Sequence, residues 1–153
     1  MYYKKRNEPV MNLPIHLMIS TPEELGVWLA KRNVSVDKED FLFSGGLTFD
    51  HVDANGSPLV WFPKPEEGSG IQLRAVVHET FHLWTFVKSQ MVGSKDIELN
   101  IHNAEYDAYH FHQLAEMVFA FAMDGCDHTM QFPTADRHPK KAQIELEDKK
   151  ADD

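Results

Sequence analysis

The chain has almost no cysteine: Cys126 is the only one among 153 residues. An intrachain disulfide is therefore excluded, and the fold must depend on its hydrophobic core or on a bound metal. The sequence also lacks a run of about 18 apolar residues, which argues against a membrane-spanning helix. Its basic N-terminal segment has no apolar stretch typical of a secretory signal, because Pro14 and His16 interrupt the only candidate. We therefore expect a cytoplasmic protein.

Positive charge is also scarce in this chain. Lys and Arg total 15 against 24 Asp and Glu, which gives a net charge of −9. Binding to phosphate backbones or anionic lipids depends on clustered Lys and Arg, so we expect neither nucleic acid nor a membrane as partner. Apolar residues, in contrast, make up 42% of the chain and include ten Phe, enough to build the core of one domain. The sequence leaves the oligomeric state open.

The ends of the chain differ from its middle. Residues 133–153 are charged and poor in large apolar side chains, so we expect a flexible tail after a single domain over residues 1–132. Residues 1–12 are polar and show no clear period. They are expected to form a loose arm.

Strand and helix patterns follow this arm. An apolar run predicts a short strand over residues 15–19. Thr21, followed by a proline and two glutamates, is typical of a helix start and predicts an amphipathic helix over residues 22–32. Two apolar runs flanking Asn55-Gly56 predict a β-hairpin over residues 47–62.

Two long helical patterns occupy the second half of the domain. One covers residues 71–91 with Gly93 as a C-terminal stop, and the other covers residues 103–123 before Gly125. Together these patterns predict an α+β domain. In it, a small antiparallel hairpin or sheet packs on the two helices.

The first of these helices carries the motif His78-Glu79-Thr80-Phe81-His82. Histidines four residues apart lie one turn apart on one helix face, so both imidazoles can reach one tetrahedral Zn²⁺ at about 2.0–2.1 Å. Glu79 lies about 100° around the helix from His78, beside the metal but not on it. We therefore predict His78 and His82 as zinc ligands and Glu79 as general base.

The residues around this motif extend the match. Val76 to Trp84 fit the signature of the zincin metallopeptidases throughout: an uncharged residue, any residue, His-Glu, two uncharged residues, His, an uncharged residue and a hydrophobic residue. The metzincin extension is excluded, because Thr85 and Lys88 stand where it requires Gly and His. The segment Glu105-Tyr106-Asp107-Ala108-Tyr109 resembles the second-helix motif of the gluzincin branch, in the ExxAY form found in small bacterial and phage-encoded proteins of this type.

This resemblance covers about residues 47–123. It implies a minimal zincin-like fold, a Zn²⁺ cofactor, Glu105 as third metal ligand, and hydrolysis of a peptide or protein substrate. In zincins an extended peptide pairs with the strand above the active-site helix, which here corresponds to residues 47–52 or 59–62. Other side chains compete with Glu105 for the third ligand position. They are His102, Asp107, His110 and His112.

Further catalytic candidates lie on the second helix. Tyr106 and Tyr109 are candidates for donating a hydrogen bond to the developing oxyanion, although tyrosines at helical spacing are more often part of a core. His112 lies two turns after Glu105 on the same face, in reach of a substrate, and is otherwise a surface histidine. His51 on the hairpin is a candidate similar to Tyr106 and Tyr109. We predict Tyr109 and His112 as catalytic residues together with Glu79.

Two other functional classes stay open. The chain is also consistent with a non-catalytic zinc-binding domain that binds a partner protein through the same cleft. A structural zinc site would then have a fourth protein ligand in place of water. In the third interpretation the motif is accidental and the chain is a metal-free interaction domain.

Overall fold

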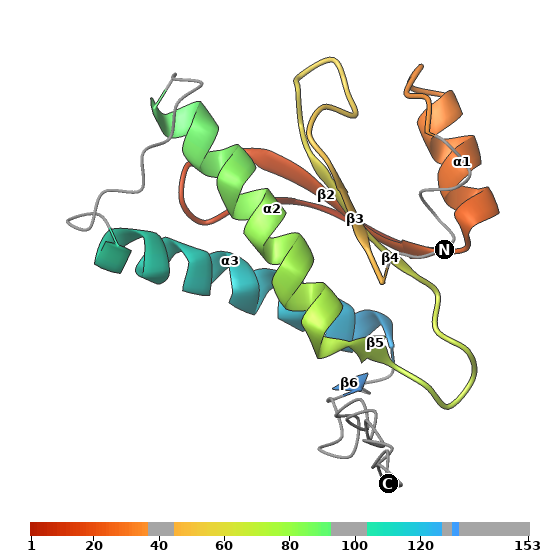
Figure 1. The fold of residues 1–153 in the computed structure, drawn as a ribbon. Coiled ribbons are helices and arrows are strands. Elements are labelled where there is room, and N and C mark those ends of the chain that lie inside the picture. Colours follow the sequence, from red (N-terminus) through yellow and green to blue (C-terminus); the bar gives the residue numbers. More distant parts are fainter. Residues whose placement is uncertain (37–44, 93–103, 127–129, 132–153) are drawn as a thin grey trace, which may run out of the picture.

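A four-stranded sheet and three helices make up most of the computed structural model, which describes residues 1–36, 45–92, 104–126 and 130–131 (Figure 1). The predicted α+β class is thus confirmed. The predicted tail over residues 133–153 lies outside the described residues. No helix in the described ranges is long and apolar enough to cross a membrane.

Strands predominate in the first half of the described chain, and the two long helices follow one another in the second half. In order they are β1 (Tyr2–Asn7), β2 (Pro14–Ser20), α1 (Pro22–Ala30), β3 (Leu47–Phe49), β4 (Leu59–Pro63), β5 (Ile71–Gln72), α2 (Leu73–Val92), α3 (Ala104–Gly125) and β6 (Met130–Gln131). The strand order of the main sheet is β1-β2-β4-β3, and β5 and β6 form a separate parallel pair.

The predicted hairpin is present, with Leu47 of β3 opposite Trp61 of β4. The sheet as a whole is mixed, however, because β4 lies parallel to β2 while the other two pairings are antiparallel. The connection from β2 to β4 runs through α1 and the edge strand β3. This arrangement leaves β3 at one edge of the sheet and β1 at the other.

The prediction of a loose arm over residues 1–12 is wrong. This segment forms β1, which pairs with β2 from Tyr2 opposite Ile19 to Asn7 opposite Pro14. The turn between the strands contains the buried carboxylate of Glu8, which accepts backbone hydrogen bonds from Val10, Met11 and Leu13. The sequence does not reveal the strand, because most of its side chains are exposed and its residues, YYKKRN, show no apolar–polar alternation. Backbone pairing and the buried turn hold it in place.

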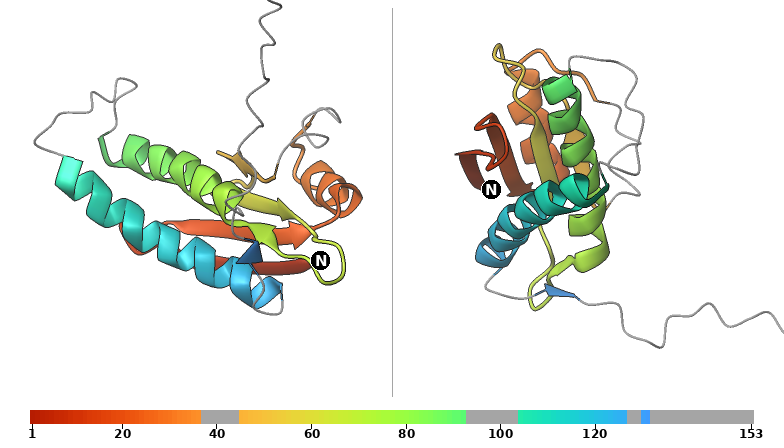
Figure 2. Two further views of the ribbon diagram at one scale, coloured as in Figure 1. Left: turned by 60° about the horizontal axis from the view of Figure 1, so that its bottom comes forward. Right: turned by 90° about the vertical axis from the view of Figure 1, so that its left-hand side faces the viewer.

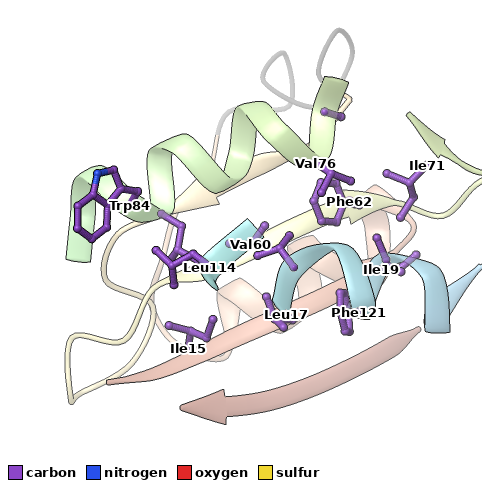
Figure 3. Close-up of a cluster of buried hydrophobic side chains, with 14 of the residues drawn as sticks. Ile15, Leu17, Ile19, Val60, Phe62, Ile71, Val76, Trp84, Leu114 and Phe121 are labelled. Atoms are coloured by element: carbon purple, nitrogen blue, oxygen red, sulfur yellow. The ribbon is translucent and has the colours of Figure 1, made fainter. Parts of the chain in front are cut away.

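Alternation along β2 and β4 gives the sheet two buried faces. One face packs on α1 through a cluster that includes Met18, Trp61 and Leu29. The other packs on α2 and α3, and Figure 3 shows this cluster in close-up. Its labelled members are Ile15, Leu17, Ile19, Val60, Phe62, Ile71, Val76, Trp84, Leu114 and Phe121. Burial of each such side chain contributes about 1.5–3 kcal/mol, so this second face anchors α2 to the sheet.

Helix α1 begins where the local signals place it. Thr21 accepts a hydrogen bond from the backbone of Glu24, and the Glu24 carboxylate accepts one from the backbone of Thr21, which completes a capping box at the start of α1. The bounds of helices α2 and α3 differ by only a few residues from those of the two predicted long helices. They pack against each other on one side of the sheet, as the two views in Figure 2 show.

Candidate active site

The two motif histidines lie together on the exposed side of α2. Their Nε2 atoms are 3.1 Å apart, and the ring planes make an angle of 80°. Two nitrogen ligands of a tetrahedral zinc ion, each at about 2.0–2.1 Å, lie about 3.3–3.4 Å apart. His78 and His82 therefore fit as two ligands of one zinc ion. In the absence of a cation, one ring would donate an N–H to the other.

Glu79 points from α2 toward the sheet and is only 4% exposed. Its Oε2 accepts a hydrogen bond of 2.8 Å from the hydroxyl of Thr48, a residue of the edge strand β3. A buried carboxylate is costly unless its oxygens have partners. Within the described residues this hydroxyl is the one protein donor to the carboxylate. A carboxylate has about four acceptor sites, so one donor uses only part of this capacity.

A cleft of about 580 Å³ lies between β3 and α2. Its lining consists of Gly45, Gly46, Leu47, Thr48, Arg74, Ala75, His78, Glu79 and His82. All three motif residues thus border one space, although Glu79 is buried and the histidines are exposed. The predicted ligand pair and the predicted base are therefore accessible to the same bound molecule.

Gly46 lets the strand approach the helix closely. A Cβ atom at this position would lie 2.8 Å from Cγ of Glu79 and 2.9 Å from Cδ1 of Phe62. Both distances are below normal carbon–carbon contact, so a larger residue would displace the carboxylate or the strand. The glycine is needed for space, since its backbone does not adopt a positive φ.

The predicted third ligand does not join the histidines. Glu105 lies exposed in the first turn of α3. Asp107, two residues later, pairs with Lys88 at 2.5 Å. Lys88 is six residues past His82, about 9 Å along the helix axis. The start of α3 therefore packs beside the second half of α2. Across the part of the chain that the structure describes, no three His, Cys, Asp or Glu side chains are grouped to hold one metal ion.

Three of the four competing ligand candidates do not line the cleft. Asp107 is engaged by Lys88, and the His110 ring stacks on Trp84 with centroids 6.0 Å apart. His112 is exposed and pairs with Glu116 one turn later on α3. None of the three lines the cleft. His102 lies outside the described residues.

The predicted oxyanion donors whose side chains are described do not line the cleft either. Tyr109 is 60% exposed, and its hydroxyl accepts a hydrogen bond from Gln113 on the same helix. His51 packs edge-on against Phe86, and neither Tyr109 nor His51 lines the cleft. The side chain of Tyr106 lies outside the described residues. Tyr109 and His112 thus remain predictions that the geometry of the cleft does not favour.

Sequence reasoning missed two polar residues of the cleft. Arg74 precedes His78 by four residues, so helical spacing alone could have placed it on the same face. Thr48 carried no such signal, because its contact with Glu79 joins elements 31 residues apart.

No known family model, curated protein or solved structure matches this chain. The resemblance to zincins therefore rests on the motif residues themselves. The function has to be argued from the geometry of the cleft between β3 and α2.

Proposed function

We propose that this chain is a zinc-dependent hydrolase that cleaves peptide bonds, with His78 and His82 as metal ligands and Glu79 as general base. The observation that carries the proposal is the convergence of three groups on one cleft. Two imidazole nitrogens lie at a separation that suits shared ligation, and the buried carboxylate borders the same space. A chance pair of surface histidines would have no reason to adjoin a buried carboxylate at an open cleft.

The chemistry divides between the metal and the chain. Bound zinc would lower the pKa of a coordinated water to about 7 and polarise a carbonyl group. Glu79 takes a proton from the attacking water and delivers it to the leaving amine. Thr48 holds one oxygen of this carboxylate, so the other is left to face the reactants. Such positioning keeps the base within the short range that proton transfer requires.

A peptide substrate is favoured by the edge strand beside the cleft. Strand β3 is the last in the strand order, so one of its edges has no partner strand among the described residues. Free N–H and C=O groups on an edge strand pair with an extended peptide by β-augmentation. A peptide bound along Leu47–Phe49 would cross the cleft in front of the histidine pair.

A third protein ligand is part of the proposal. Catalytic zinc sites usually have three protein ligands and one open position. The resemblance to gluzincins assigns this role to Glu105. No third ligand is grouped with the histidines among the described residues, and zinc held without this ligand would lack the usual catalytic coordination. The second candidate function is therefore a protein-interaction domain that binds zinc without catalysis.

Zinc titration and one substitution test both functions. Protein stripped with a chelator and retitrated should bind one zinc ion, and replacing both histidines with alanine should abolish binding. Glu79→Gln should keep the zinc and lose about 10²- to 10⁴-fold in peptide or casein cleavage. Glu116→Gln, on the exposed side of α3, is the matched control and should leave cleavage unchanged.

The outcomes separate the candidates. Equal cleavage by wild type and Glu79→Gln would remove this residue from the mechanism. Zinc binding through both histidines without any cleavage would favour the non-catalytic domain. Failure to bind zinc at all would leave the metal-free interpretation.

A further inference from the structure

Arg74 lies at one end of the cleft that contains the histidine pair. It belongs to the first turn of α2, one helical turn before His78. Side chains at this spacing start about 5–6 Å apart on the same face. A group bound by Arg74 would thus lie beside the reacting bond of a molecule held at the motif.

The guanidinium of Arg74 uses one of its edges in a hydrogen bond within the described residues. Its Nε donates a hydrogen bond of 2.6 Å to the side-chain oxygen of Gln72, which steadies the head group. Among the described residues, no carboxylate lies within ion-pair distance of it. Among the described residues the edge formed by Nη1 and Nη2 makes no hydrogen bond, and its planar fork matches a carboxylate in bidentate geometry.

The charges around the cleft single out this arginine. Of the lining residues that the structure describes, Arg74 alone carries a permanent positive charge, and Glu79 is engaged by Thr48. The chain as a whole has a net charge of −9. A single cation in the cleft of an acidic protein favours anionic groups at that one position over others.

We propose that Arg74 forms a subsite for a carboxylate of the substrate, and that the enzyme prefers peptides with such a group near the cleaved bond. This inference rests on the proposed hydrolase function. An extended peptide advances about 3.3 Å per residue, so one helical turn on α2 corresponds to about two residues of substrate. The carboxylate is that of an Asp or Glu side chain, or the C-terminal carboxylate of the peptide.

Matched peptides distinguish these two sources. One series carries Glu or Gln at each position within about two residues of the cleaved bond, and each peptide is made as the free acid and as the C-terminal amide. Cleavage is measured with the zinc-loaded full chain, and binding is measured by fluorescence anisotropy with the Glu79→Gln variant. Arg74→Gln removes the charge, and Arg74→Lys keeps it without the fork. Arg6→Gln on β1, at the opposite edge of the sheet, is the control.

The wild type should prefer one carboxylate peptide over its neutral partner by about ten- to a hundredfold in kcat/KM and in affinity, the range of a hydrogen bond to a charged group. Arg74→Gln should remove this preference, Arg74→Lys should keep part of it, and Arg6→Gln should keep all of it. Equal handling of charged and neutral peptides, or a preference that survives Arg74→Gln, would overturn the subsite. Selective binding through Arg74 without cleavage by the wild type would support the subsite and overturn the hydrolase. Neither cleavage nor selective binding would overturn both.

Discussion

Replacing Thr48 with valine tests how Glu79 is held, because valine keeps the shape of threonine and has a methyl group in place of the hydroxyl. In the wild type this hydroxyl donates to Oε2 of Glu79 at 2.8 Å, within the range of a strong O–H···O bond. The valine leaves a carboxylate that is 4% exposed without its protein donor. The base then gains freedom to rotate or to recruit a water in place of the hydroxyl.

The size of the effect follows from the strength of this bond. A hydrogen bond to a charged group contributes about 1.5–3 kcal/mol. Because 1.36 kcal/mol corresponds to a tenfold change in rate, kcat of Thr48→Val should fall by about 10- to 150-fold. KM and zinc content should change little, since Thr48 has no hydrogen bond to either histidine. Thr48→Ser keeps the donor and should restore kcat to within about threefold of wild type.

The assay compares wild type, Thr48→Val and Thr48→Ser in steady-state peptide cleavage, with zinc content and urea unfolding measured on the same preparations. A kcat unchanged in Thr48→Val would refute the idea that the hydroxyl positions the base. Equal losses in both variants would also refute it, because packing of the threonine methyl group would then explain the result. A loss of zinc would show that the strand supports the metal site instead.

The remaining predictions concern close packing and buried charge. Gly46→Ala should lower the free energy of unfolding by about 1–3 kcal/mol and impair cleavage, because its Cβ would overlap the proposed base. Gly26→Ala, in an open position inside α1, is the control and should raise the free energy of unfolding by about 0.5–1 kcal/mol in urea titrations. Equal changes in this free energy at the two glycines would contradict the reasoning. Burial lowers the pKa of His16 below its usual 6.5, although the Asp53 carboxylate beside it acts in the opposite direction. The unfolded chain takes up this proton first, so the stabilising contribution is complete above pH 6.5 and is lost as the pH falls toward the folded-state pKa. Unfolding free energies measured between pH 7.5 and 5 should therefore fall with acidification. The fall should be less steep in His16→Gln, a variant that also loses the hydrogen bonds of the ring to Tyr3 and Asp53. Parallel slopes in wild type and variant would refute the assignment.

Features that depend on neighbours in the chain were predictable from the sequence. The pairing of His78 with His82 follows from 3.6 residues per turn, and the start of α1 follows from Thr21 and Glu24, three residues apart. The hairpin and the two long helices are local patterns of the same kind. In each case the interacting groups are brought together by the geometry of one element, so no knowledge of the rest of the fold is needed.

Only the tertiary structure decided what surrounds the motif. Strand β1 exists because β2 offers it a backbone partner, and the β2–β4 pairing makes the sheet mixed. The contact of Thr48 with Glu79 and the distance of Glu105 from the histidines depend on how a strand and a second helix pack on α2. Such packing is set by buried side chains from many segments at once, and the spacing of residues along the chain does not contain it.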